Sequence, residues 1–106
     1  MIIVTTHEIK HREIKHVVGA VYGTAVRSRS FFGLIGAVVR SLFGGSQGGF
    51  IKMTNLARDQ ALQVLTEHAE QLGCDAVLSM RFDACELMGS MTEITAYGTG
   101  VVLEPE

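Results

Sequence analysis

Three sulfur-bearing side chains, Cys85, Met88 and Met91, stand close together near the end of the chain. Thiolate and thioether sulfurs are soft ligands, and they suit Cu(I) and other heavy metal ions. The sequence lacks the paired Cys-x-x-Cys spacing of a strong metal site. Methionine also fills irregular gaps in cores and interfaces. The pattern favours a packed hairpin, with a soft-metal site at these three residues as the alternative.

The histidines His7, His11 and His16 form a second group. On a strand, His7 and His11 would share a face but lie ~13 Å apart, which is too far for one metal ion. Solvent-exposed loop histidines are therefore the favoured interpretation. The alternative is a ring of subunits in which symmetry gathers one histidine from each copy.

His68, Cys74 and Arg40 are the remaining candidates for chemistry. His68 falls in the apolar stripe of an expected helix, which favours a core or interface histidine over a base or ligand in a cavity. Cys74 follows the negative end of that helix, which opposes thiolate formation, so we expect a buried thiol. Arg40, with Arg27 and Arg29, is expected to pair with acids of a neighbouring subunit.

The chain has 106 residues, 47% hydrophobic and 19% charged, and we expect one domain over residues 1–106. The charged fraction lies below the usual ~25%, which indicates surface covered in an oligomer. Residues 1–58 carry eight Lys and Arg against two acids, and residues 59–106 carry one against nine, so the halves bear +6 and −8. Opposite faces suit head-to-tail packing around a ring, and clustering on a solvated surface is the alternative. The net charge of −2 argues against nucleic acid.

The start of the chain predicts a cytoplasmic protein. Met1–Val4 is apolar, but charged residues follow at once, so there is no hydrophobic region of a signal peptide. Free thiols are then the default for both cysteines. The longest apolar stretch, Phe31–Phe43, contains Arg40 and is shorter than the ~20 residues of a membrane span. We therefore expect no membrane.

Hydrophobic periodicity predicts the order β-β-α-α-β-β. The expected strands cover Met1–Thr6, His16–Ser28, Asp75–Asp83 and Met91–Leu103. The expected helices cover Phe31–Phe43 and a segment that starts between Phe50 and Asn55 and ends at Leu72, with Gly73 as the C′ residue. Residues 44–49 are expected to form a flexible loop and residues 86–90 a turn. This order predicts an α+β fold of two layers, with an antiparallel or mixed sheet of about four strands and helices on one face.

The pattern also predicts which side chains share a face. On the strand Asp75–Asp83, Ala76, Leu78, Met80 and Phe82 are expected to share one face, and Val77, Ser79, Arg81 and Asp83 the other. The long helix is expected to bury one stripe and to leave Leu62 on the far side as a partner contact. The stripe consists of Phe50, Met53, Ala57, Ala61, Val64, Leu65, His68 and Leu72.

Five motifs in this order resemble the YbjQ-like family, which is described as heavy-metal-binding. They are Thr5-Thr6, the strand from Gly19 to Gly23, the pair Gly44-Gly45, the helix with Ala57-Arg58 and Ala61 that ends in Leu72-Gly73-Cys74-Asp75, and the closing Gly98-Thr99-Gly100-Val101. The resemblance implies a small α+β subunit that assembles into a cytoplasmic ring, a pentamer or a multiple of one. The chain differs from the family's usual polar residues at Thr24, Ser46, Phe50 and Ile51.

Three functional hypotheses follow. The first is a homo-oligomeric ring without enzymatic activity that binds a metal or small ligand at subunit interfaces. The second is a heavy-metal-binding protein that uses Cys85, Met88 and Met91, or clustered histidines such as His7 and His11. The third is an enzyme with an inter-subunit site. The cofactor of the first two would be a soft or heavy metal ion.

Overall fold

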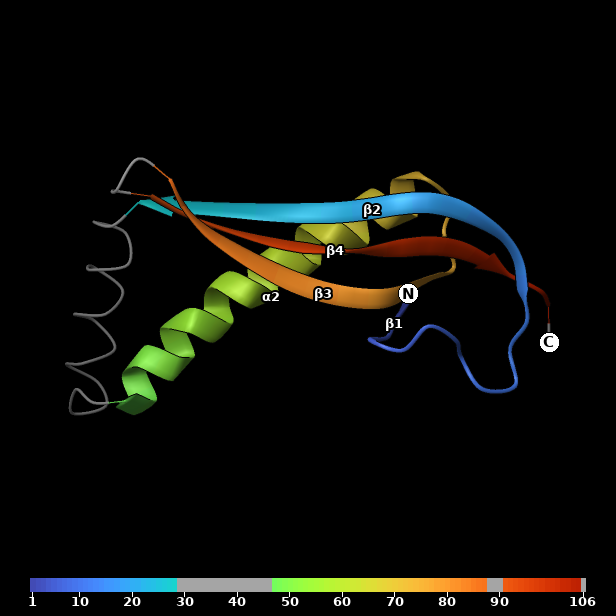
Figure 1. Cartoon of the computed structure of the whole chain (residues 1–106), viewed down its shortest axis with the longest axis horizontal. Coiled ribbons are helices and arrows are strands. Elements are labelled where there is room, and N and C mark those ends of the chain that lie inside the picture. Colours follow the sequence, from blue (N-terminus) through green and yellow to red (C-terminus); the bar gives the residue numbers. More distant parts are fainter. Residues whose placement is uncertain (29–46, 88–90, 106) are drawn as a thin grey trace.

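The computed structural model of the chain describes residues 1–28, 47–87 and 91–105. Its elements are β1 (Ile2–Ile3), β2 (Ile14–Ser28), α2 (Gln47–Gln71), β3 (Ala76–Leu87) and β4 (Met91–Leu103). The sheet has the strand order β1-β3-β4-β2 (Figure 1). β1 pairs with β3 in parallel, while β4 pairs antiparallel with both β2 and β3. The expected α+β class with a mixed four-stranded sheet is confirmed.

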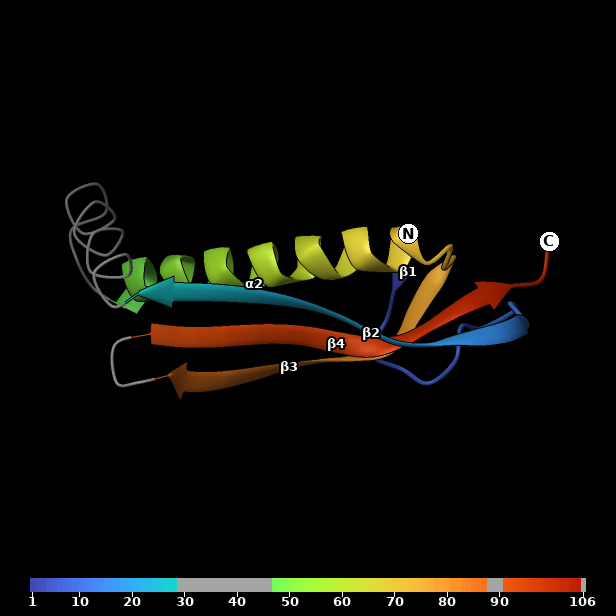
Figure 2. The same ribbon diagram turned by 90° about the horizontal axis from the view of Figure 1, so that it is seen from above.

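Helix α2 covers one face of this sheet, and the segment after β1 passes across part of the other face (Figure 2). The larger core cluster lies between helix and sheet. Its buried members are Val21, Ala25, Ala57, Ala61, Leu65, Ala69, Cys74, Val77, Ile94 and Ala96. A second cluster is packed with Val4 and Ile9 of the N-terminal segment. Its buried members are Ala76, Leu78, Val101 and Leu103. The rest of this sheet face is covered neither by the N-terminal segment nor by α2.

A glycine on β2 lets the helix sit close to the sheet. A Cβ at Gly23 would lie 2.5 Å from the carbonyl oxygen of Ala61 and would overlap the backbone of Leu65. The helix presents small side chains there, because Ala57, Ala61 and Ala69 are all buried. Gly23 is therefore an interior strand glycine that permits the close approach of another backbone.

The buried stripe of α2 differs from the expected one by a rotation of the helix. Val64 and Leu72, predicted as core, are 37% and 46% exposed. Leu62, predicted on the far side, is partly buried against the core, and Ala69 is completely buried. Ala57, Ala61 and Leu65 of the expected stripe are buried as predicted, and the close backbone contact at Gly23 fixes the side of the helix that faces the sheet.

A bulge in β3 overturns the predicted alternation of that strand. The register to β4 shifts between Leu78 and Arg81, and Ser79 has a φ of 54°. A bulge places one extra residue in a strand, so side chains beyond it exchange faces. Ala76 and Leu78 lie on one face and Val77 on the other, as predicted, but Met80 beyond them packs against the cluster under the helix, on the face of Val77.

Several predicted boundaries also need correction: β1 covers only Ile2–Ile3 of the predicted Met1–Thr6, and β2 begins at Ile14 instead of His16. α2 begins at Gln47, within the segment that was expected to be a loop. Helix formation is cooperative, and the N–H groups of the first turn need no partner within the helix, so a helix can extend by a turn beyond its predicted start. β3 continues to Leu87 because Cys85 and Leu87 remain paired with β4. β4 spans the predicted residues.

The end of α2 forms as predicted. Gly73 has a φ of 78°, and its N–H donates to the carbonyl of Glu70, while the N–H of Cys74 donates to that of Ala69. This bond pair is a Schellman cap, which favours glycine in the left-handed region. The predicted helix Phe31–Phe43 lies outside the described residues. Within those residues, no helix combines the length and the apolarity needed to cross a membrane.

Candidate functional site

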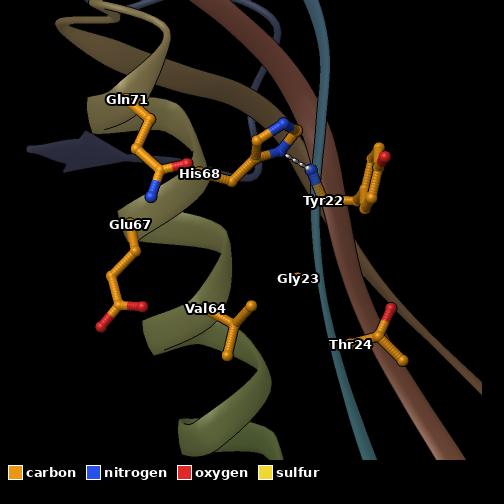
Figure 3. A pocket seen from close by; sticks show the side chains of 7 residues that line it. All are labelled: Tyr22, Gly23, Thr24, Val64, Glu67, His68 and Gln71. Carbon is orange, nitrogen blue, oxygen red and sulfur yellow. Dashed lines mark hydrogen bonds between the residues drawn. The ribbon is translucent and has the colours of Figure 1, made fainter.

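A shallow groove of about 370 Å³ lies between α2 and the outer edge of β2. One side is formed by the β2 segment Tyr22, Gly23 and Thr24, and the other by α2 (Figure 3). The helical lining residues are Val64, Glu67, His68 and Gln71. The groove thus brings together two segments that are far apart in the sequence.

The imidazole of His68 bridges helix and strand. The backbone N–H of Tyr22 donates to Nδ1 of His68 over 3.2 Å, and the two rings lie 4.7 Å apart between centroids. Because β2 pairs with β4 on its inner side, this N–H points away from the sheet. His68 is therefore the hydrogen-bond partner of an edge group and is only half-buried.

This bond determines what His68 can do chemically. Nδ1 accepts a hydrogen bond, so in the neutral ring Nε2 carries the proton and is a donor. No lone pair is then left to bind a metal ion or to take a proton from a substrate. In this arrangement the groove offers a donor at His68 and a carboxylate at Glu67. Arg40, the other residue of the enzyme hypothesis, lies outside the described residues.

The main chain of β2 forms the open edge of the groove. The register from Gly19 to Ser28 is regular, so alternate residues turn their N–H and C=O groups outward. Because the N–H of Tyr22 points outward, the main-chain groups of Thr24, two residues farther along, also point outward. Among the described residues, no strand lies along this side of β2. Such an edge is a template for adding another strand.

A second candidate region is the sheet face turned away from α2. We call it the open face. Each row of this face consists of one residue from β2, one from β4 and one from β3 that are paired across the sheet. The residues of the open face are Tyr22, Thr24, Val26, Arg81, Asp83, Cys85, Glu93, Thr95 and Tyr97. Tyr22 and Tyr97 are 58% and 45% exposed there. The open face is therefore partly apolar and lies next to the groove along β2.

A chain of hydroxyl groups holds one carboxylate on the open face. Thr95 Oγ1 donates to Oε1 of Glu93 over 2.9 Å, and it lies 3.2 Å from Oγ1 of Thr24. Since the single hydroxyl proton of Thr95 goes to Glu93, Thr24 is the donor in the second bond. The Glu93 carboxylate is thereby oriented beside Cys85, its cross-strand partner.

The structure brings two of the predicted sulfur ligands to the same face. Cys85 is paired with Glu93, and Met91 is paired with Leu87. Cys85 and Met91 are diagonal neighbours, and such positions lie about 7–8 Å apart, within reach of a long side chain. Cys85 is exposed, and its thiol lies 3.7 Å from the carbonyl oxygen of Glu86. Met88 lies outside the described residues.

The predicted histidine ligands lie elsewhere. His7 and His11 are exposed; His11 lies within a tight turn closed by a bridge between Ile9 and Arg12, and His7 precedes that turn. The neighbouring Thr6 is bonded to Ser79, and Cys85 lies six residues farther along β3, about 20 Å away. One chain therefore does not join His7 and Cys85 at one ion. Across the described ranges, no three His, Cys, Asp or Glu side chains converge on a point that could hold a metal.

The second cysteine is a core residue. Cys74 is buried between helix and sheet, and this desolvation, followed by the charge of Asp75, raises the pKa of its thiol. A raised pKa disfavours the thiolate that nucleophiles and metal ligands require. The prediction of a buried Cys74 is confirmed, and Cys85 is the accessible thiol.

Comparison with known proteins places the whole chain in one group. The YbjQ family model, described as "Putative heavy-metal-binding", matches residues 1–104. A UPF0145 protein of Acidiphilium cryptum is 46% identical, covering 98% of this chain and 95% of its own. A UPF0145 protein of Streptomyces coelicolor is 42% identical over the full length of both chains. A protein of unknown function from Pediococcus pentosaceus, of the DUF74 family, shares the fold with a TM-score of 0.63, 18% identity and 98% coverage of both chains.

Proposed function

Since the chain belongs to the YbjQ family, whose function is unknown and whose description is heavy-metal binding, we propose that it works as a ring-forming homo-oligomer. The expected assembly is a cytoplasmic pentamer or a multiple of one, without enzymatic activity of its own. A metal or small ligand would bind where subunits meet. The observation that carries this proposal is the set of apolar side chains that α2 and the N-terminal segment leave exposed on the sheet.

Strand β2 carries several exposed large apolar side chains, and Tyr97 of β4 is exposed beside it. Val17 is 60% exposed, Tyr22 is 58% exposed and Tyr97 is 45% exposed. Tyr22 and Tyr97 are cross-strand partners, and contiguous exposed apolar surface marks an interaction site more often than isolated exposed residues do. The two halves of the chain also bear +6 and −8, so one copy offers both signs of charge to another. A second copy therefore fits the surface better than a partner of one charge.

Light scattering on a size-exclusion column tests the assembly. A mass of several times 11.5 kDa supports the proposal, and a single copy at 11.5 kDa refutes it. Tyr97→Ser should lower the mass or weaken assembly on dilution, since it removes an aromatic group from the open face. Leu72→Ser is the matched control, because Leu72 is equally exposed but lies on the helix.

The second candidate function is soft-metal binding on the open face. Cys85 and Met91 supply sulfur ligands on neighbouring strands, and the oriented Glu93 carboxylate adds an oxygen ligand. If neighbouring sheets join edge to edge, equivalent Cys85 residues lie at least three strand spacings apart, about 14 Å. That separation is too large for one ion. Such a metal would then be held within one copy rather than shared by the ring.

Elemental mass spectrometry on the same chromatographic peak tests this candidate. Protein prepared without a histidine tag should carry about one ion per chain, and Cys85→Ser or Met91→Leu should remove it while the mass of the assembly stays unchanged. Replacing His7 and His11 with alanine tests the histidine alternative in the same way. Metal that survives all of these changes would refute both predicted ligand sets.

A further inference from the structure

We propose that His68 is a proton-operated latch, which ties α2 to Tyr22 across the groove at neutral pH and releases Tyr22 in mild acid. Both partners of the latch belong to one chain, so this inference goes beyond the proposed assembly and does not rest on it. What changes with pH is the position of one side chain and the set of groups that the groove offers.

The latch is one hydrogen bond that only the neutral imidazole can make. Nδ1 of His68 accepts from the backbone N–H of Tyr22 over 3.2 Å, and the ring centroids of the two residues lie 4.7 Å apart. An imidazole nitrogen accepts a hydrogen bond only while it carries no proton of its own. The contact between helix and strand edge therefore requires that Nδ1 stay unprotonated.

Protonation of His68 turns this contact into a clash of two donors. The imidazolium carries N–H groups at both nitrogens and has no acceptor left. Nδ1–H would then face the N–H of Tyr22 at the present separation of 3.2 Å, and neither group could satisfy the other. Turning the ring over exchanges one N–H for the other and does not help. Histidine side chains change charge between pH 5 and pH 8, so the release falls in mild acid.

The other groups around the ring do not oppose this change. From β2, the phenol of Tyr22 faces the imidazole, and phenols stay neutral up to about pH 10. From α2, the groove is lined by the carboxylate of Glu67 and the amide of Gln71. Among the described residues that line the groove, His68 is the only base. The one charged neighbour is thus an acid, which favours the imidazolium on the helix side.

The released ring has a place to go. His68 is only half-buried, so water reaches it. Gln71 lies three residues farther along α2, and side chains at this spacing are neighbours on a helix surface. Its amide oxygen can accept from the imidazolium. Figure 3 shows the His68 ring reaching across to Tyr22, with Glu67 and Gln71 beside it on the helix.

The walls of the groove stay in place while the latch moves. At Gly23, next to Tyr22, the backbone of β2 lies so close to Ala61 and Leu65 that a Cβ would overlap them. This contact holds α2 on the sheet without help from His68. Release therefore leaves the fold intact, frees the N–H of Tyr22 as a donor and places a positive charge in the groove.

NMR spectroscopy of uniformly 15N-labelled wild-type protein tests the latch without any substitution. At pH 8 the imidazole nitrogens of His68 should show a protonated Nε2 and an unprotonated Nδ1. As the pH falls from 8 to 5, the amide resonance of Tyr22 should move upfield, with the same midpoint as the His68 ring. The nuclear Overhauser contacts between the two rings should disappear over the same range.

Three results would overturn the proposal. They are a proton on Nδ1 at pH 8, a Tyr22 amide that stays in place while the His68 ring titrates, and ring contacts that persist at pH 5. His68→Gln keeps an acceptor but cannot titrate in this range, so it should abolish the movement of the Tyr22 amide. His16→Gln is the matched control, because His16 is an exposed histidine of β2. It should leave the movement unchanged, and a movement that survives in His68→Gln contradicts the latch.

A carboxylate placed beside the released ring gives a second readout. Gln71→Glu should raise the midpoint of the Tyr22 movement by about 0.1–0.4 of a pH unit, the equivalent of one charge pair on a helix surface. Gln63→Glu is the control, because Gln63 is exposed on the same helix but does not line the groove. Equal midpoints in the two variants would show that the released ring does not move toward Gln71.

Discussion

The backbone N–H of Tyr22 on the outer edge of β2 donates to Nδ1 of His68 on the helix, at 3.2 Å. This bond fixes His68 as an acceptor at Nδ1 and a donor at Nε2. It also occupies one of the edge groups that would otherwise face water. His68 was expected from its apolar neighbours to be a core or interface histidine. It lies at the boundary between the edge of the sheet and the groove.

Replacing His68 with phenylalanine should keep the ring contact with Tyr22 and remove the hydrogen-bond acceptor. We expect a loss of about 0.5–1 kcal/mol in the free energy of unfolding, at the low end for a hydrogen bond because water can reach this edge. Urea denaturation measures the change. His16→Phe is the control, since His16 is exposed. Equal stability of the two variants would contradict the bond.

Replacing Gly23 with alanine should weaken the helix–sheet packing. The new Cβ would collide with the backbone of Ala61 and Leu65, and neither can yield without moving the helix. Overpacking of this kind costs about 1–3 kcal/mol. Thermal unfolding should show a clearly lower midpoint for Gly23→Ala than for the neighbouring control Thr24→Ala. A wild-type midpoint for Gly23→Ala would mean that the helix sits farther from β2.

Replacing Arg81 with alanine should loosen the N-terminal segment. Nη1 of Arg81 donates to the carbonyl of Thr5 at 2.9 Å and to that of Met80 at 2.8 Å. Hydrogen exchange measured by mass spectrometry should rise in the peptide that covers residues 4–9, with little change in β4. Asp83→Ala, on the same face of β3, serves as the control. Unchanged exchange in that peptide would show that Arg81 does not hold the segment.

The two cysteines should differ in reactivity. We expect Ellman's reagent to modify one thiol per chain in the folded protein at pH 8 and two after unfolding, with Cys85→Ser abolishing the reaction of the folded state. Burial raises the pKa of Cys74 above its usual 9.0, so its thiol stays protonated. The associated stabilisation is complete below pH 9 and declines as the pH rises through the folded-state pKa. Cys74→Ala should therefore lose less stability than the wild type between pH 8 and pH 10.

Local chemistry in the sequence was sufficient to predict much of the fold. β4 lies where its alternating and β-branched residues placed it, and Gly73 ends the helix as its position after Leu72 predicted. These features depend on neighbours a few residues apart, so periodicity and capping determine them. The family resemblance was likewise confirmed, because it rests on the order of motifs along the chain.

The errors arose where a distant contact overrode a local pattern. Val64 was misplaced because Gly23, far away in the sequence, lets the backbone at Ala61 and Leu65 approach β2 closely, which leaves Val64 in the wall of the groove. The faces of β3 were exchanged by a bulge at Ser79, and an inserted residue leaves no mark in the periodicity before it. The separation of His7 from Cys85 was also hidden in the sequence.

By itself, the sequence determined the class of fold, the ends of the last strand, the C-terminal end of the helix, and the charge difference between the two halves of the chain. Only the tertiary structure decided that Tyr22 and His68 meet, that Phe82 and Gly23 stand level, and that Cys85 and Met91 share a face. The physical reason is that such relationships depend on strand register and helix rotation. Those are set by the packing of the whole sheet against one helix, and not by any segment alone.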